Sequence, residues 1–345
     1  MPEIPVRRIA LVRTSALGDV VHALALVNGL RRGYPEADIT WILHPVPHQV
    51  VRHQPEVEDF IVFPRGCAGM QMLRRELSKR RFDLLLLPQT SAKAHLIAAM
   101  VRAPIKLGFD FRRSREFHWL FVNRRLPSRP PSHAQELYLE FLDYLNIPRQ
   151  PLRWDIAFTD EELGWRERFF ADLGRPAVSL VLASSRPEKD WSPAGYAAVA
   201  EHLVRELDMV PLLVGGPSGR ERELAEAVEA RCRVPVIRAL DPPVRDMLLK
   251  LSGSRAVVAP DTGPLHAAVA LGVPTIGLYG YSDPRRCGPY RFRELLVDHY
   301  TNPGEDPNRP ITRKPRPGRM ATITPQEVIA RLHQALALSA APEFS

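Results

Sequence analysis

The sequence predicts an α/β protein built from two doubly wound parallel sheets, and three observations lead to this expectation. Short apolar segments alternate with amphipathic segments of helical length along most of the 345 residues. Residues 82–87 (FDLLLL) are apolar at almost every position, as in a parallel strand that helices cover on both faces. The chain is also longer than one ordinary hydrophobic core, which favours two domains of about 150 residues each.

The first series of elements lies in the N-terminal part of the chain. We expect strands at 7–13, 37–43 and 82–87 and helices at 19–32 and 69–81. Because a helix separates each of these strands from the next, the strands should lie parallel in one sheet.

A second series repeats the same alternation in the C-terminal half. The prolines of 146–154 (NIPRQPLRW) and a helix near 160–172 separate it from the first series. The expected strands are 177–183, 209–215, 255–259 and 274–280, and the expected helices are 193–207, 218–231, 243–252 and 264–271.

These two series predict two domains. We expect an N-terminal Rossmann-like domain at 1–160 and a C-terminal Rossmann-like domain at 176–322, with a loop at 301–318. A terminal helix within 323–342 should pack back on the N-terminal domain. Ligands of open α/β sheets bind beyond the carboxyl ends of the strands, so we expect the functional residues in those loops, facing a cleft between the domains.

Composition excludes several classes of protein. The chain has no run of about 18 apolar residues and no signal-like N-terminus, so we expect a cytoplasmic protein. Its three cysteines, Cys67, Cys232 and Cys287, have no paired spacing, which argues against a disulfide framework and against a metal site.

The positive charge is concentrated in one half of the chain. Residues 1–150 hold 22 Lys and Arg against 14 Asp and Glu, whereas residues 151–345 hold 25 of each, so the first half carries the whole net charge of +8. Such a field favours an anionic partner of that half: nucleic acid, an acidic membrane surface or a phosphorylated acceptor. The alternative is a set of solvated arginines without a partner.

The loop after the first strand, 13–23 (RTSALGDVVHA), carries an acid at an unusual place. A dinucleotide-binding fold would have G-x-G-x-x-G here, and the single glycine, Gly18, therefore disfavours NAD. Asp19 follows in the first turn of the expected helix, near the positive end of its dipole. An acid at this place is most often a helix cap, so the residues alone leave both capping and catalysis open.

Two loops of the second half suit a phosphate group. In 182–191 (LASSRPEKDW), Ser184 and Ser185 can donate hydrogen bonds and Lys189 adds a positive charge. As a lone motif this loop is weak evidence, because serines are common after strands.

The segment 259–280 is more specific. Asp261, Thr262 and Gly263 precede a helix that should begin near Pro264, and the free amides and dipole of a helix N-terminus favour an anion. His266 lies one turn further on and can contact the same anion. The alternative is a capped turn with a packed histidine.

Five segments, taken in order, resemble the ADP-heptose:lipopolysaccharide heptosyltransferase family, a group of inverting glycosyltransferases with the GT-B fold. TSALGDVVHALAL (14–26) is similar to the opening motif of the family and DTGPLHAAVALGVP (261–274) to its donor motif. YGYSDPRRCGPY (279–290) is similar to the loop that follows that motif. PQTSAKAH (88–95) and GFDFRRSREF (108–117) are similar to acceptor-side segments of the members that add the first heptose.

The resemblance implies a reaction and roles for residues. A nucleotide-diphosphate sugar, expected to be ADP-heptose, would donate its sugar to a hydroxyl of an anionic glycan or glycolipid such as the lipopolysaccharide inner core. One displacement needs one general base, which matches Asp19, with no cofactor beyond the co-substrate and no metal. Lys189 would neutralise the leaving diphosphate. The implied donor-binding residues are Ser184, Ser185, Lys189, Asp261, Thr262, Gly263 and His266, and the acceptor-binding residues are Thr14, Ser15, Gly18, Lys93, Arg112, Arg113 and Arg115.

The sequence departs from the family pattern at one donor position. Pro217 stands where members that add the first heptose carry a ribose-binding glutamate, and Ser218 or Glu221 is expected to replace it. The alternatives are therefore a GT-B transferase with another nucleotide sugar or a small acceptor, and a nucleotide-sugar-binding protein without transfer. We expect no nucleic-acid partner, because the aromatic residues near 112–115 fit a buried helix, whereas peripheral contact with the inner membrane surface stays open.

Overall fold

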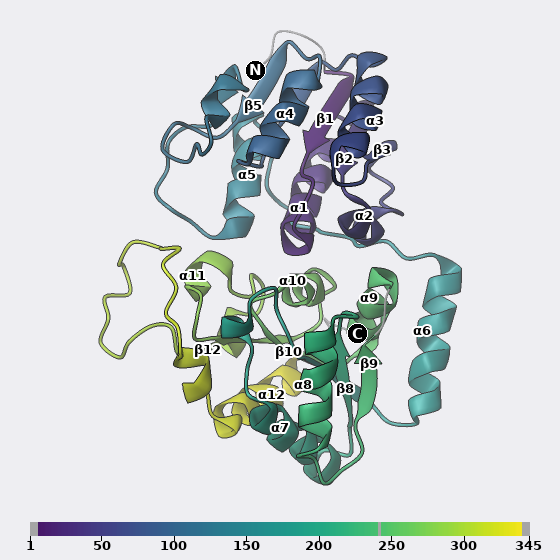
Figure 1. The fold of residues 1–345 in the computed structure, drawn as a ribbon, viewed down its shortest axis with the longest axis vertical. Helices are drawn as coiled ribbons and strands as arrows, with labels where there is room; N and C mark the ends of the chain where they lie inside the picture. Colours follow the sequence, from purple (N-terminus) through teal and green to yellow (C-terminus); the bar gives the residue numbers. More distant parts are fainter. Residues whose placement is uncertain (1–5, 241–242, 340–345) are drawn as a thin grey trace. The chain divides into compact units, whose positions relative to one another are not determined.

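The computed structural model describes residues 6–240 and 243–339. Its contacts divide the chain into two units, residues 1–130 with 134–157 and residues 131–133 with 158–345, which we call unit 1 and unit 2. Each unit contains one six-stranded sheet with helices on its faces (Figure 1). No helix within the described ranges is long and apolar enough to cross a membrane.

Unit 1 has the strand order β3-β2-β1-β4-β5-β6, and every neighbouring pair is parallel. The strands are β1 (Arg8–Val12), β2 (Asp38–Leu43), β3 (Asp59–Val62), β4 (Leu84–Leu86), β5 (Ile105–Gly108) and β6 (Arg124–Arg125). The helices are α1 (Leu17–Gly33), α2 (Pro45–Val51), α3 (Cys67–Ser78), α4 (Ala92–Met100), the short 3-10 helix η1 (His118–Leu120) and α5 (Ala134–Tyr144).

The core of unit 1 fixes where its functional loops emerge. Ile9 to Val12 of β1 are fully buried, because α3 and α4 cover one face of the sheet and α1 with α5 covers the other. Gly29 lets α1 and α5 approach closely, since a Cβ there would lie 2.4 Å from the Leu142 side chain. Strands β1, β4 and β5 are neighbours, so the loops that follow them meet at one edge of the sheet.

Unit 2 has the order β12-β11-β10-β7-β8-β9, again with every neighbouring pair parallel. The strands are β7 (Ala177–Val181), β8 (Val210–Gly215), β9 (Ile237–Leu240), β10 (Ala256–Pro260), β11 (Thr275–Tyr279) and β12 (Val297–Asp298). The helices are α6 (Asp160–Leu173), η2 (Pro187–Lys189), α7 (Pro193–Glu206), α8 (Gly219–Glu229), α9 (Val244–Gly253), α10 (Gly263–Ala270), α11 (Pro284–Cys287), η3 (Arg293–Leu295), η4 (Arg319–Thr322) and α12 (Pro325–Ser339).

The terminal helix α12 packs within unit 2. Its buried residues Val328, Leu332 and Ala335 belong to the face that meets α7, β10 and β11. The sequence led us to expect that this helix packs back on the N-terminal domain. The described contacts use its apolar face within unit 2, and packing on the N-terminal domain stays a prediction.

The fold class is confirmed, because both sheets are parallel and covered by helices. Strands whose residues are buried on both faces agree with the expected ranges: β7 lies within 177–183, and β10 overlaps 255–259 and ends one residue later. Elements with mixed burial, such as the edge strands β3 and β9, have no counterpart among the expected strands.

Gly280 provides a test of how tightly unit 2 is packed beside its functional loops. A Cβ at this position would lie 2.5 Å from the backbone nitrogen of Met320 and 2.6 Å from the carbonyl carbon of Arg319. Backbone cannot rotate away as a side chain can, so Gly280→Ala should lower the free energy of unfolding by about 1–3 kcal/mol. Chemical denaturation measures this change.

Gly219→Ala is the matched control for that measurement. Gly219 begins α8, and a Cβ there would meet nothing within 4 Å in the described structure. Its substitution should leave stability unchanged or raise it by up to about 1 kcal/mol. Equal effects of the two substitutions would contradict the packing described for Gly280.

Candidate functional site

The residues that carry chemistry lie at the carboxyl ends of three neighbouring strands in each unit. In unit 1 these are the segments after β1, β4 and β5, and in unit 2 the segments after β7, β10 and β11. Parallel neighbours present their following loops at the same sheet edge, which is where open α/β folds bind ligands. We describe the two groups separately.

In unit 1, Asp19 is held by an ion pair with Arg13. Arg13 follows β1 directly, its guanidinium pairs with the Asp19 carboxylate, and its Nη1 donates to the Pro88 carbonyl after β4 at 3.0 Å. The Arg13 side chain is only 11% exposed, whereas that of Asp19 is 40% exposed. The carboxylate is therefore fixed from one side and open to solvent on the other.

Tyr138 of α5 approaches the same carboxylate. Its hydroxyl donates to Asp19 Oδ1 at 3.4 Å, and its ring lies 5.9 Å from the Arg13 guanidinium carbon. Burial raises the pKa of Tyr138 well above its usual value, so the hydroxyl stays protonated and can donate. Burial lowers the pKa of Arg13, but its neighbours Tyr138 and Asp19 outweigh burial and raise it.

The structure also supports the capping role that the residues left open for Asp19. Asp19 Oδ2 accepts from the Ala16 N–H at 3.4 Å, in the first turn of α1. This contact is long for a hydrogen bond, and the ion pair with Arg13 is the closer one. This hydrogen bond orients the carboxylate toward the loop and leaves its solvent-exposed side accessible.

The other residues expected at this sheet edge differ in their burial. Thr14 is buried and binds Gln89 after β4 through its N–H at 2.8 Å and its hydroxyl at 3.2 Å, so it joins two loops. Gly18 is buried in the first turn of α1. Ser15 is half-buried in the loop, and Lys93 lies exposed in the first turn of α4. The loops therefore bring Thr14, Ser15, Gly18 and Asp19 together.

The three arginines of the loop after β5 have different environments. Arg113 pairs with Asp110 and with buried Glu140 of α5, and donates to the Pro127 carbonyl. Its guanidinium is therefore engaged in internal contacts, and the expectation that it contacts an acceptor stays a prediction. Arg112 and Arg115 are exposed and available for an anion.

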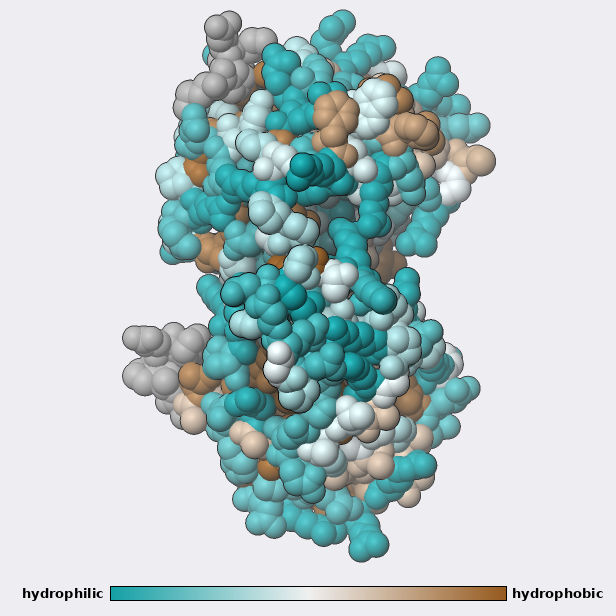
Figure 2. Space-filling model, turned by 90° about the vertical axis from the view of Figure 1, so that its left-hand side faces the viewer, coloured by the Kyte–Doolittle hydropathy of each residue, from teal (hydrophilic) through white to brown (hydrophobic). Residues whose placement is uncertain are grey.

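The aromatic residues of this loop correct one expectation. The sequence pattern indicated a buried helix here, yet Phe117 is 67% exposed and Trp119 is 38% exposed. Only the one-turn η1 forms, and Phe121 after it is half-buried. Figure 2 shows hydrophobic side chains, in brown, among hydrophilic ones on the surface of unit 1.

His118 anchors the loop from inside. It is fully buried, its Nε2 accepts from the Phe109 N–H at 3.0 Å, and its Nδ1 lies 3.1 Å from His95 Nε2. The bond from a backbone donor requires an unprotonated Nε2, so the ring is neutral. Burial, with smaller effects from His95 and Arg125, lowers the pKa of His118 to about 4.

This shift predicts a pH dependence of stability. Above the usual histidine value of 6.5, His118 is neutral in the folded and unfolded states alike. Between pH 6.5 and about 4 the unfolded chain binds a proton that the folded chain does not. The free energy of unfolding therefore decreases as the pH is lowered through this range, by up to about 3 kcal/mol. Denaturation curves across this range measure the slope. His118→Gln should flatten it, and an unchanged slope in that variant would contradict the assignment.

In unit 2, Lys189 and Asp261 form the centre of the site. Lys189 Nζ lies 2.7 Å from Asp261 Oδ2, and His266 Nε2 lies 3.9 Å from Asp261 Oδ1. Asp261 is 8% exposed, and burial alone would raise its pKa. Lys189, His266 and a hydrogen bond from Ser282 outweigh burial and lower the pKa, so the carboxylate is charged.

The start of α10 adds donors beside this pair. The helix begins at Gly263 with Thr262 as its N-cap residue, and in the described chain the Thr262 side chain makes no capping hydrogen bond. The first amides of α10 therefore keep their capacity for a ligand, and the helix dipole favours an anion there. Sequence reasoning predicted this arrangement, and the structure brings Lys189, Asp261, Thr262, Gly263 and His266 together.

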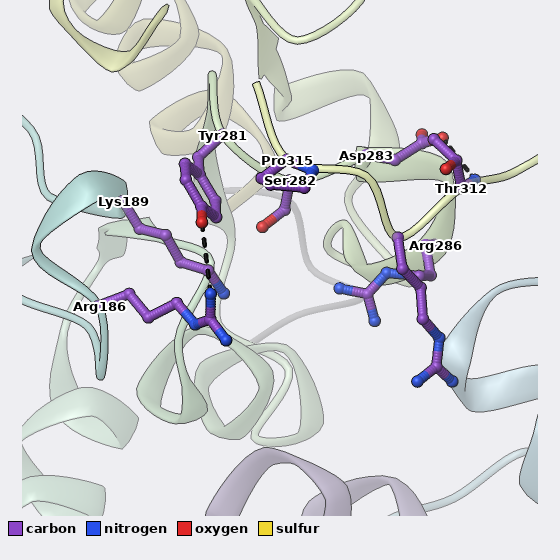
Figure 3. Close-up of a pocket in the computed structure, with 9 residues that line it drawn as sticks. Arg186, Lys189, Tyr281, Ser282, Asp283, Arg286, Thr312 and Pro315 are labelled. Carbon is purple, nitrogen blue, oxygen red and sulfur yellow. Dashed lines mark hydrogen bonds between the residues drawn. The ribbon is translucent and has the colours of Figure 1, made fainter. Parts of the chain in front are cut away.

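A cavity of about 240 Å³ opens beside Lys189. Figure 3 shows Lys189 and Arg186 facing it from one side, with the Ser282 hydroxyl and the Arg286 guanidinium directed toward it from the other. Tyr281 fixes Arg186 through a hydrogen bond of 3.4 Å from Nη1 to its hydroxyl. Arg313 also lines the cavity, so four cationic side chains surround it.

Asp283 lies at the cavity but points toward Thr312, as Figure 3 shows. Its carboxylate accepts from the Thr312 N–H at 3.2 Å and pairs with Arg309 at 2.9 Å and Arg285 at 3.3 Å. It therefore holds the 309–313 segment against the end of β11, and its charge is engaged by Arg309 and Arg285.

Three residues expected to bind the donor, Ser184, Ser218 and Glu221, have internal partners, and their donor roles stay predictions. The Ser184 hydroxyl already donates to the Arg186 carbonyl at 2.7 Å, so it closes its own loop, whereas Ser185 is exposed. Ser218 and Glu221 form a reciprocal cap of α8, and Glu221 also accepts from the Gly216 N–H at 2.6 Å. Their polar atoms serve the helix start, which argues against either one replacing the ribose-binding glutamate.

Sequence reasoning missed five residues of these two groups. Arg13 could have been found, because an arginine directly after a buried strand is unusual. Tyr138 gave no signal, since it lies in α5, far from Asp19 in the sequence. The remaining three, the cavity arginines, are Arg186, Arg286 and Arg313.

No group of three or more His, Cys, Asp and Glu side chains among the described residues could hold a metal ion. The expectation of a reaction without metal or cofactor stays a prediction.

Several known proteins with a similar sequence or structure belong to one family. A family model described as glycosyltransferase family 9 (heptosyltransferase) matches residues 70–309. The chain is 32% identical over 297 residues to the lipopolysaccharide core heptosyltransferase OpsX of Haemophilus influenzae, with 85% of each protein covered. It is 29% identical over 301 residues to lipopolysaccharide heptosyltransferase 1 of Pseudomonas aeruginosa, with 82% of this chain and 81% of that protein covered.

Two solved structures share the whole architecture. A glycosyl transferase family 9 protein from Veillonella parvula matches with a TM-score of 0.82 and 22% identity, over 97% of this chain and 99% of that one. The E. coli heptosyltransferase WaaC with ADP matches with a TM-score of 0.74 and 21% identity, over 95% and 99%.

Proposed function

The chain belongs to glycosyltransferase family 9, the heptosyltransferases, and on that basis we propose that it transfers heptose from ADP-heptose to the lipopolysaccharide core. The observation that carries the donor assignment is the cluster of Lys189, the α10 N-terminus and the cationic cavity. A diphosphate matches this chemistry, because it brings two adjacent negative charges and oxygens that accept hydrogen bonds. The family resemblance seen in the motifs is confirmed by the same comparisons.

In the proposed reaction an acceptor hydroxyl attacks the anomeric carbon of the donor. The new bond joins the acceptor oxygen to that carbon while the bond from the carbon to the diphosphate oxygen breaks. The hydroxyl proton passes to Asp19, and the electron pair leaves with ADP. Attack opposite the leaving group inverts the anomeric carbon in a single displacement, so no covalent enzyme intermediate is required.

Lys189 and the first amides of α10 would stabilise the charge that develops on the leaving diphosphate. Fixed donors of this kind act without reorganisation, and the loss of one typically costs about 3 kcal/mol in the transition state. Asp261 keeps the Lys189 ammonium in place and would accept a hydrogen bond from a hydroxyl of the donor. The role of Asp261 is thus binding and orientation.

Arg13 and Tyr138 would orient the base. The ion pair with Arg13 and the hydrogen bond from Tyr138 occupy part of the carboxylate. In the proposed reaction its exposed part would accept the proton of the acceptor hydroxyl. General-base assistance is typically worth about 10²–10⁴ in rate.

An anionic acceptor is consistent with unit 1. Lys93, Arg112 and Arg115 are exposed on the segments after β4 and β5, while Arg113 is committed to internal ion pairs. These three cations would pair with acidic sugars of the acceptor. We assign the reaction to the cytoplasmic side of the membrane as part of the same proposal.

A second candidate is a family 9 enzyme with a different nucleotide sugar. Pro217, together with the capping roles of Ser218 and Glu221, argues against the ribose contact expected at this position. A thermal-shift panel of nucleotide sugars separates the candidates. A ligand at 100 times its dissociation constant stabilises the folded chain by about 2.7 kcal/mol, and we expect this from ADP-heptose and not from UDP-sugars.

Asp19→Asn tests the catalytic assignment. The amide keeps the size of the side chain but cannot take a proton, so kcat for heptose transfer should fall by about 10²–10⁴. Calorimetry of ADP-heptose should give an unchanged dissociation constant, because the donor residues lie in unit 2.

Asp38→Asn is the matched control, since Asp38 is an exposed aspartate at the start of β2 in the same unit. It should transfer heptose at the unaltered rate. A folded Asp19→Asn protein with the same kcat as this control would remove Asp19 from the mechanism.

A further inference from the structure

An apolar surface patch lies on the β5–β6 connection of unit 1. We define it by Phe111, Phe117, Trp119 and Leu120, which are 62%, 67%, 38% and 61% exposed. Seven large hydrophobic residues are exposed in the described parts of the chain, and four of them fall within this short connection. Gathered exposure of this kind marks an interaction site, whereas scattered single residues do not.

The members of the patch contact one another. The rings of Phe111 and Trp119 lie 5.9 Å apart, and the Arg125 guanidinium lies 4.4 Å from the Phe111 ring centre. Arg125 also donates to the Trp119 carbonyl at 3.1 Å. Leu96, 57% exposed, extends the apolar surface onto α4, one turn beyond Ala92, whose N–H donates to the Glu116 carboxylate.

The same segment turns its polar side chains inward. Asp110 and His118 are buried, and Arg113 is paired inside with Asp110 and Glu140. This is the reverse of the usual distribution, in which a loop exposes its charges and buries its aromatic rings. The internal bonds hold the apolar side chains outward instead of letting them collapse onto the sheet.

Backbone strain supports the same conclusion. Glu116 and Phe117 have φ values of 49° and 62°, a region that L residues other than glycine, asparagine and aspartate rarely adopt. Such conformations persist only where the surroundings hold them, and here the Glu116–Ala92 bond does so. This backbone conformation directs the Phe117 ring into solvent.

The patch is surrounded by positive charge. Residues 111–129 contain six arginines and a single acidic residue, Glu116, which is bound to α4. Arg113 and Arg129 form ion pairs within unit 1, and the other arginines of the segment are Arg112, Arg115, Arg124 and Arg125.

We propose that this patch docks unit 1 on the surface of a bilayer that contains anionic lipids. Phenylalanine, tryptophan and leucine side chains partition into the boundary between headgroups and acyl chains. Arginines beside them pair with lipid phosphates, and each basic residue near an anionic surface adds attraction that salt screens. The proposal goes beyond the proposed function, because it concerns where the chain lies and not what it transfers.

Nucleic acid fits the patch less well. Stacking requires open aromatic faces, but Arg125 already covers a face of Phe111. Leu120 and Leu96 offer aliphatic surface, which acyl chains match and bases do not. We therefore make nucleic-acid binding an outcome of the test.

Co-sedimentation of the full chain with vesicles tests the proposal without any sugar donor. We expect binding to vesicles of phosphatidylglycerol and phosphatidylethanolamine, weaker binding at high salt, and little binding to phosphatidylcholine. The double variant Phe117→Asn, Leu120→Gln removes apolar surface, and asparagine tolerates the positive φ at position 117. Its partition coefficient should fall about tenfold.

Met72→Gln is the matched control, because Met72 is exposed on α3 of the same unit and lies outside the patch. It should bind vesicles as the unaltered chain does. Thermal melting of each variant reports whether it is folded.

Lipids with brominated acyl chains quench the fluorescence of tryptophan side chains that insert among them, so they report insertion of the unaltered chain directly. Trp41, Trp154 and Trp191 are buried, and Trp165 is half-buried on α6 of unit 2. Quenching by insertion of the patch should therefore arise from Trp119 and should be lost in Trp119→Phe but kept in Trp165→Phe. The proposal is overturned if the full chain does not bind anionic vesicles, if the double variant binds as well as Met72→Gln, or if random oligonucleotides bind the patch in place of lipid.

Discussion

The ion pair between Lys189 and Asp261 is the interaction on which the candidate site of unit 2 depends. Asp261 is buried at the end of β10, and removing the partner of a buried charge typically costs about 3–5 kcal/mol. The loop after β7 can supply that partner because β7 and β10 are neighbours in the sheet. The pair is neutral as a unit, and Arg186 and Arg286 line the cavity beside it.

Unit 1 has a similar ion pair at the corresponding sheet edge. Arg13 follows the central strand β1 and pairs with Asp19 in the first turn of α1, so a cation again fixes a carboxylate at the carboxyl ends of parallel strands. The difference lies in exposure, because Asp261 is enclosed and the Asp19 side chain is 40% open. An enclosed carboxylate suits the orientation of a ligand, whereas an open one can exchange a proton with it. The proposed roles of binding for Asp261 and base for Asp19 follow from this contrast.

The sequence predicted what depends on local pattern and missed what depends on tertiary contact. Strands such as β7 were found because burial on both faces leaves a continuous apolar run, while the edge strands β3 and β9 are short and only partly buried, and their four residues each include a charged one. Lys189 and Asp261 were found because each follows a strand within a recognisable motif. Tyr138 could not be found, since it reaches Asp19 only when α5 packs on α1. The exposed Phe117 was misjudged as part of a buried helix, because nothing in the local pattern reports the internal bonds that turn the ring outward.

Calorimetric titration with ADP and with adenosine tests the central claim most directly, in the unaltered chain, in Lys189→Met and in Arg175→Met. Arg175 is a charged residue at the amino end of β7, where it pairs with Asp208, and serves as the control. The account predicts that the unaltered chain and Arg175→Met bind ADP much more tightly than adenosine, and that Lys189→Met loses about tenfold or more in ADP affinity while binding adenosine as before. ADP affinity that is the same in Lys189→Met and in the control would contradict it.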